Sequence, residues 1–255
     1  MIGAIFQKKH DVLDFNSSSA FPDRLASLID VGNIIRRKKA VSRQYLGASQ
    51  LGASCERAIQ YGYTKTPVDP GRETSGQTLR IFERGHLIET KMATWLRRAG
   101  FKLRTHNRQR EQIGFSTLEG QFQGHIDGII TKGPDLLEYP CLWENKCLGA
   151  KYWREIASKG LAIARPEYAA QIALYQAYLE LYQHPALFTA VNADTMEIYA
   201  ERVPFDADLA QRTSDRAVKI ITATRAGETL PRSFAGQDHF ECRMCQWQNR
   251  CWRAS

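Results

Sequence analysis

Three residues suited to metal-assisted hydrolysis stand on two neighbouring segments that have the character of strands. The first segment reads GHIDG at residues 124–128, and the second reads LWENK at residues 142–146. Side chains two positions apart point to the same side of a strand, so Glu144 and Lys146 share one face. If Asp127 faces them from the neighbouring strand, two carboxylates and one ammonium group converge.

The chemistry that this set favours is phosphodiester hydrolysis. Carboxylate oxygens are hard ligands of the kind that Mg²⁺ and Mn²⁺ prefer, and a cation beside them can activate water or neutralise charge on phosphorus. The backbone carbonyl of Asn145 could complete the coordination shell. A Glu-x-Lys triplet alone is common on solvated strands. Here Trp143 and Cys147 indicate a buried strand, where an isolated charge is costly unless it is paired or binds metal.

The cysteines form a second candidate site. The C-terminal segment has the spacing Cys-x2-Cys-x5-Cys, made by Cys242, Cys245 and Cys251, and Cys55 is the leading candidate for a fourth ligand. A reducing cytoplasm disfavours disulfides, so we expect metal ligation. Thiolate spacing alone does not separate zinc from an iron–sulfur cluster. The two other cysteines, Cys141 and Cys147, are interpreted as small core residues.

The composition restricts the class of protein, the compartment and the partner that we expect. With 43% hydrophobic and 24% charged residues, the 255-residue chain is typical of a folded protein. No apolar run approaches the roughly 20 residues that span a bilayer, and the N-terminus lacks a signal peptide's apolar region. We therefore expect a cytoplasmic protein without a membrane partner. The net charge of +8 favours a polyanionic partner.

Periodicity and turn-forming residues predict an α/β chain. The leader, residues 1–45, is expected to be irregular or partly helical, and residues 64–77 to be a loop. Helices are expected over residues 78–99, 168–183 and 206–225. Extended segments are expected over residues 101–112, 118–130 and 141–147, as a β-meander, and over 186–191 and 196–203, as a strand pair.

From about residue 51 to residue 252, the motifs resemble those of the PD-(D/E)XK nucleases, specifically the RecB-like branch. GHIDG at residues 124–128 and Glu-Asn-Lys at 144–146 are similar to the two central motifs of that superfamily. RGHLIE at residues 84–89 resembles its first motif, and QIALY at residues 171–175 resembles its Gln-x3-Tyr motif. The resemblance implies a restriction-endonuclease-like core, in which helices flank a mixed central sheet.

The resemblance also implies a metal site. Asp127 and Glu144 would bind Mg²⁺ or Mn²⁺, together with the backbone carbonyl of Asn145. Glu89 would add a carboxylate, although many RecB-like enzymes have histidine at this position. His86 competes for the role, and Glu89 is favoured because carboxylate is the harder ligand.

The remaining motif residues would act on water and substrate. Lys146 would orient or deprotonate the attacking water, and Gln171 and Tyr175 would position this lysine or a DNA phosphate. Gln171 and Tyr175 are four residues apart, which places them on one face of a helix.

The cysteine pattern resembles that of the AddB and CRISPR-associated iron–sulfur nucleases. In those families an upstream cysteine joins three C-terminal ones around a [4Fe–4S] cluster, which here would be held by Cys55, Cys242, Cys245 and Cys251, with zinc as the alternative. Such a cluster would join the N- and C-terminal segments and serve as a structural staple.

These expectations combine into one hypothesis. A leader with the first cysteine (residues 1–77), a nuclease core (78–233) and a cysteine tail (234–255) would form one structural unit. The chain would be a metal-dependent deoxyribonuclease, an exonuclease acting on DNA ends or single strands, in a bacterial or phage-infected cell. The resemblance suggests a recombination or CRISPR-type protein partner. The alternative is a non-catalytic nucleic-acid-binding subunit that keeps an iron–sulfur or zinc staple.

Overall fold

The computed structural model describes residues 20–253, so residues 1–19 of the predicted leader and residues 254–255 of the tail lie outside it. The chain divides into two compact units. Of the described residues, the smaller unit comprises residues 20–41 with residues 74–83, and the larger unit comprises residues 42–73 with residues 84–253. Among the described residues, no helix is long and apolar enough to cross a membrane.

The smaller unit pairs α1 (Ala20–Lys39) with the first part of α3 (Gly76–Arg98). The leader thus contains a long helix. An ion pair joins Arg80 to Asp30, and Arg36 Nη1 lies 3.3 Å from Glu83 Oε1. These two ion pairs join the beginning of α3, up to Glu83, to α1 within the smaller unit.

The larger unit contains two β-sheets. The five-stranded sheet has the order β2-β5-β6-β7-β8, and the three-stranded sheet has the order β1-β4-β3. The strands β6 and β7 run parallel, as do β1 and β4, whereas the other neighbours are antiparallel. The strands are β1 (Leu46–Gly47), β2 (Lys102–Arg104), β3 (Gly114–Thr117), β4 (Phe122–His125), β5 (Gly128–Lys132), β6 (Cys141–Leu148), β7 (Ala186–Asn192) and β8 (Ile198–Val203).

The expected β-meander is confirmed in part: β2, β5 and β6 are consecutive antiparallel neighbours, but β3 and β4, which lie between β2 and β5 in the sequence, belong to the other sheet. The segment 118–130 is divided at Ile126 and Asp127 into β4 and β5, which belong to different sheets. The amide of Ile126 donates to the carbonyl of Ile113 at 2.9 Å. The segment 101–112 is a strand only over β2, because the side chain of Asn107 then accepts hydrogen bonds from two following amides and closes a turn.

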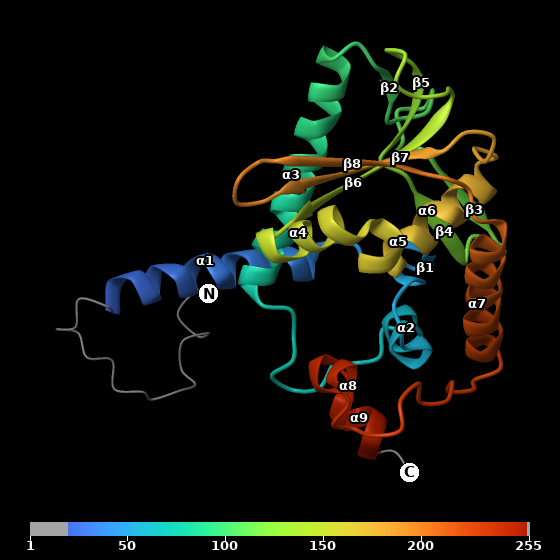
Figure 1. The fold of residues 1–255 in the computed structure, drawn as a ribbon. Coiled ribbons are helices and arrows are strands. Elements are labelled where there is room, and N and C mark those ends of the chain that lie inside the picture. Colours follow the sequence, from blue (N-terminus) through green and yellow to red (C-terminus); the bar gives the residue numbers. More distant parts are fainter. Residues whose placement is uncertain (1–19, 254–255) are drawn as a thin grey trace. The chain divides into compact units, whose positions relative to one another are not determined.

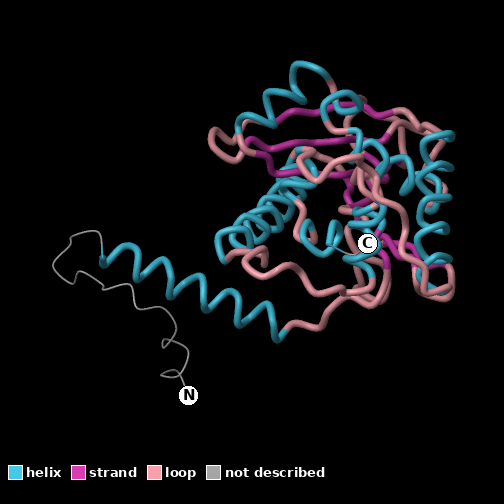
Figure 2. Tube along the Cα trace, turned by 90° about the horizontal axis from the view of Figure 1, so that it is seen from below, coloured by secondary structure: helices cyan, strands magenta, loops and turns pink. Residues whose placement is uncertain are grey.

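Helices cover both faces of the five-stranded sheet (Figures 1 and 2), which confirms the predicted mixed sheet flanked by helices. On one face, Ile172 of α6 and Ile220 of α7 share a core with Phe188 of β7. On the other face, Met92 of α3 packs in the cluster that contains Trp143 of β6. The remaining helices are α2 (Glu56–Tyr63), α4 (Ala150–Lys159), α5 (Leu161–Ala164), α6 (Pro166–Tyr178), α7 (Ala207–Arg225), α8 (Phe240–Met244) and α9 (Gln248–Arg253), with a 3₁₀ turn, η1 (Ala48–Gln50).

Most of the other predicted elements are confirmed. The loop over residues 64–77, the three helices and the pair β7–β8 form close to their predicted positions. The helix α7 begins where expected because Asp206 caps it, accepting a hydrogen bond from the amide of Leu209 at 2.8 Å. The helix α6 ends at Tyr178, five residues earlier than predicted, and Leu179 follows as its C-terminal cap.

Candidate active site

The strand β6 carries the centre of the site. Glu144 and Lys146 lie on the same face, as predicted, and an ion pair joins Lys146 Nζ to Glu144 Oε1. Glu144 is only 1% exposed, because β6 is covered on both faces and paired on both sides. Lys146 Nζ also lies 5.1 Å from the centroid of the Tyr168 ring, a cation–π arrangement that holds the ammonium against α6.

Asp127 reaches these residues from the break between β4 and β5. The antiparallel register pairs Gly128 with Trp143. The residue before Gly128, Asp127, therefore lies beside the residue after Trp143, Glu144. Its Oδ2 accepts a hydrogen bond from the amide of Asn145 at 2.7 Å. In an extended strand the N–H and C=O of one residue point to the same side, so the Asn145 carbonyl also faces Asp127. The structure therefore brings these residues together.

The helix α3 adds a further carboxylate to this group. The side chain of Glu89 is 32% exposed, and burial, followed by the charge of Asp127, raises its pKa. His86 Nδ1 lies 3.8 Å from Glu89 Oε2, but its side chain is 82% exposed. Of the two competing residues, Glu89 is therefore the more buried and His86 is exposed to solvent.

The site holds more negative than positive charge. Burial and the charge of Asp127 raise the pKa of Glu144 to about 8, and burial followed by Asp127 raises the pKa of Glu89 to about 7. Burial also raises the pKa of Asp127. Burial lowers the pKa of Lys146, but Glu144 and Asp127 outweigh it and raise this pKa overall, so the lysine is charged. One ammonium cannot neutralise three carboxylates, so the group retains protons at neutral pH unless a cation binds.

One carboxylate oxygen has a free bonding position. Glu144 Oε2 is buried and has no hydrogen-bond partner among the described residues. Since buried polar atoms are nearly always paired, such an atom marks a position for a ligand. The donors are carboxylate oxygens and one backbone carbonyl, the ligand type that Mg²⁺ and Mn²⁺ prefer, although no three His, Cys, Asp or Glu side chains of residues 20–253 are grouped as a metal site.

Gln171 and Tyr175 form the wall beside this centre. They share one face of α6, and Gln171 Nε2 donates to Tyr175 Oη at 3.1 Å. Burial and then the charge of Glu144 raise the pKa of Tyr175, so its hydroxyl stays protonated. Gly124 of the GHIDG motif is required here, because a Cβ at this position would stand 2.6 Å from the Tyr175 ring.

Two further groups of residues have no role assigned to them by the sequence patterns. Tyr168 lies one helical turn before Gln171, and this spacing was the available signal. The other group lies on β4 and before β1, where the rings of Tyr45 and His125 have centroids 6.1 Å apart and Arg43 lies 5.1 Å from the Tyr45 ring. His125 is exposed and only two residues from Asp127, and no periodicity links it to residue 45.

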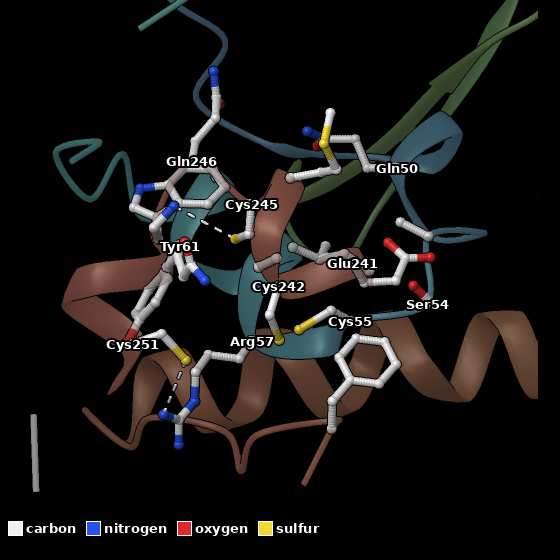
Figure 3. Close-up of a pocket in the computed structure, with 18 of the residues that line it drawn as sticks. Gln50, Ser54, Cys55, Arg57, Tyr61, Glu241, Cys242, Cys245, Gln246 and Cys251 are labelled. Atoms are coloured by element: carbon white, nitrogen blue, oxygen red, sulfur yellow. Dashed lines mark hydrogen bonds between the residues drawn. The ribbon is translucent and has the colours of Figure 1, made fainter. Parts of the chain in front are cut away.

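The four predicted cysteine ligands line one pocket of ≈ 410 Å³ in the larger unit. Cys55 precedes α2, and the others come from the tail: Cys242, Cys245 and Cys251. Figure 3 shows their thiols around this pocket, with Arg57 Nη1 donating to Cys251 Sγ at 3.6 Å. Within residues 20–253, however, no group of three or more His, Cys, Asp or Glu side chains has the arrangement that would hold a metal ion.

The two remaining cysteines lie away from this pocket, on β6. Cys141 is fully buried, and burial raises its pKa to about 11, which makes it an inert core thiol. Cys147 is half-buried, and burial likewise raises its pKa, although the nearby charge of Arg84 opposes this effect.

Comparison with known proteins relates the chain to others by fold. No protein-family model matches it, and no curated protein matches it at a significant level. Among solved structures, the alkaline exonuclease LHK-Exo from Laribacter hongkongensis is 14% identical, with a TM-score of 0.50 over 72% of this chain and 89% of that one. The same enzyme in complex with dAMP gives 16% identity and a TM-score of 0.49 over the same shares of the two chains. The structure of SSO0001 gives 14% identity and 0.49, over 91% of this chain and 98% of that one. The chain therefore has a fold similar to that of an exonuclease.

Proposed function

We propose that this chain is a metal-dependent deoxyribonuclease of the PD-(D/E)XK kind, of the RecB-like branch, that hydrolyses phosphodiester bonds at DNA ends or in single strands. The observation that carries the proposal is the convergence of Asp127, Glu144 and Lys146 in a buried site where one carboxylate oxygen is unpaired. Buried charges on this scale cost stability, so a site that keeps them points to a ligand or to chemistry.

The proposed cation is Mg²⁺ or Mn²⁺, held by Asp127, Glu144 and the Asn145 carbonyl, with Glu89 as an additional carboxylate. When bound, it would supply Lewis acidity that activates water and stabilises charge on the phosphate. Lys146, which Glu144 keeps charged and Tyr168 holds in place, would donate hydrogen bonds to the attacking water or to a phosphate oxygen.

Gln171 and Tyr175 have a positioning role in this proposal. Their mutual hydrogen bond fixes both side chains beside Glu144, and the protonated phenol can donate to an anionic oxygen. The net charge of +8 is appropriate for a DNA-binding protein. The fold shared with an alkaline exonuclease supports action on DNA ends, and the exposed ring of His125 beside Tyr45 offers a stacking surface for an unpaired base.

For the cysteine pocket we propose a [4Fe–4S] cluster, with zinc as the alternative. The four thiols line one pocket, which supports a site that they share. Thiolate ligands suit both zinc and an iron–sulfur cluster. The cluster is preferred because the cysteine spacing resembles that of iron–sulfur nucleases. Its role would be structural.

The test is cleavage of end-labelled and circular DNA, single- and double-stranded, by anaerobically purified protein with Mg²⁺, Mn²⁺ or EDTA. Lys146→Ala is compared with Lys132→Ala, an exposed lysine at the end of β5. Metal-dependent cleavage that is lost only in Lys146→Ala supports the proposal, and resistance of circles would indicate an exonuclease. Equal cleavage by both variants would refute the site. DNA binding without cleavage would indicate a non-catalytic subunit.

A further inference from the structure

Within the cysteine tail, residues 240–253 are held by a loop that is far away in the sequence, residues 66–72, which we name the clamp loop. Figure 1 shows the segment between α2 and α3 passing α8 and α9. Several hydrogen bonds join the two segments, and three of them involve backbone carbonyl acceptors near Asp69. The amide of Asp69 donates to the Gln246 carbonyl at 2.9 Å, Trp247 Nε1 donates to the Thr66 carbonyl at 2.9 Å, and Arg250 Nε donates to the carbonyl of residue 67 at 3.2 Å.

Asp69 is the centre of this contact. It is 4% exposed, and its two carboxylate oxygens accept hydrogen bonds from consecutive tail amides. Asp69 Oδ2 lies 2.6 Å from the amide of Asn249, and Oδ1 lies 3.1 Å from the amide of Arg250. These amides belong to the first turn of α9, which carries Cys251. Hydrogen bonds to a charged acceptor are the strong class, so this carboxylate fixes the start of the helix.

Arg72 contacts the residues that precede α9 and the first residue of that helix. Its Nη1 donates to the carbonyls of Arg243 and Cys245, at 2.7 and 3.0 Å, and its Nη2 donates to Gln248 Oε1 at 2.6 Å. The segment between Cys245 and Cys251 is therefore fixed at its beginning by one clamp-loop residue and near its end by another.

We propose that the clamp loop fixes the tail cysteines without metal, and that Asp69 is the positioning residue of the proposed cluster site. The inference rests on the proposed function of the cysteines. None of the clamp contacts uses a thiol, so all of them are available to the metal-free chain. The cluster then enters a site that is already organised, and the ordering of the tail does not depend on it.

This differs from the expectation that the cluster itself staples the chain ends. If metal binding alone ordered the tail, removal of the metal would release residues 240–253. In that case the free energy of metal binding would be what stabilises the folded tail. A clamp made of protein groups predicts that the metal-free tail stays docked.

The experiment is hydrogen exchange on the full chain after treatment with EDTA and a reductant, followed by reconstitution with iron(II) and sulfide. In the metal-free wild type, the amides of Asn249 and Arg250 should remain protected. In Asp69→Ala they should exchange about ten- to a hundredfold faster, the loss expected for hydrogen bonds to a charged group. Less iron per chain should be retained after reconstitution. Asp69→Asn, which keeps one acceptor oxygen, should fall between, and Asp208→Ala, an exposed residue of α7, should match the wild type.

Unprotected tail amides in the metal-free wild type would refute the clamp, as would unchanged exchange and iron content in Asp69→Ala. Failure of the cluster proposal looks different. If the wild type takes up neither iron, on reconstitution with iron(II) and sulfide, nor zinc, in a parallel reconstitution with zinc(II), while its tail amides stay protected, the cofactor assignment is wrong and the clamp stands.

Discussion

Raising the pH without divalent metal should destabilise this protein, because its carboxylates are buried together. The pKa of Glu144 is raised from 4.5 to about 8 in the folded chain, by burial first and then by the charge of Asp127. Between these values the folded protein keeps a proton that the unfolded chain releases. Stability is therefore lost as pH rises through this window, and it levels off above about pH 8. For one retained proton, the unfolding free energy should fall by about 2–3 kcal/mol between about pH 5.5 and 7.5.

The assay is urea unfolding of the EDTA-treated protein at several pH values, comparing wild type with Glu144→Gln. Glutamine keeps the shape of the side chain but cannot ionise. The substitution therefore also removes the charge that the Glu144 carboxylate exerts on Asp127 and Glu89. The variant should therefore show a shallower fall in unfolding free energy across the window. The matched control is Glu155→Gln, since Lys159 and then Arg165 lower the pKa of Glu155, and this substitution leaves the buried carboxylates intact.

A divalent cation should reverse the effect. Mg²⁺ or Mn²⁺ competes with the retained protons, so it should raise the melting temperature of the wild type more at about pH 8 than at about pH 5.5. This gain should be reduced in Glu144→Gln. An unfolding free energy that falls equally in wild type and Glu144→Gln would refute the charge assignment, and a metal response that does not depend on Glu144 would refute the cation site.

Three further predictions follow from single contacts. Tyr175→Phe leaves the buried amide of Gln171 without its acceptor and should cost about 1–3 kcal/mol in urea unfolding, with slower DNA cleavage; an unchanged unfolding midpoint would contradict the role of this hydrogen bond. Asp206→Ala removes the cap of α7 and should cost about 1 kcal/mol without changing cleavage, as thermal unfolding would show. His125→Ala removes the ring beside Tyr45 and should weaken binding of single-stranded DNA by about 1–3 kcal/mol in fluorescence anisotropy with EDTA, whereas duplex binding should change less.

The sequence alone was sufficient where the information was local. Alternation along β6 put Glu144 and Lys146 on one face, and a spacing of four residues put Gln171 and Tyr175 on one face of α6. Apolar periodicity located the main helices and the pair β7–β8. These features depend on residues within a few positions of each other, and the repeat of a strand or helix fixes the direction of their side chains.

The tertiary structure decided what depends on distant partners. The break between β4 and β5 could not be predicted from local patterns. At this break the side chain of Asp127 accepts a hydrogen bond from the amide of Asn145, which is 18 residues away in the sequence. The clamp was likewise invisible, since Asp69 and the amide of Asn249 are 180 residues apart. Local patterns determine which way a side chain points, but only long-range packing determines what it meets there. The sequence thus determined the residue types and faces of both candidate sites, and the fold decided which of them come together.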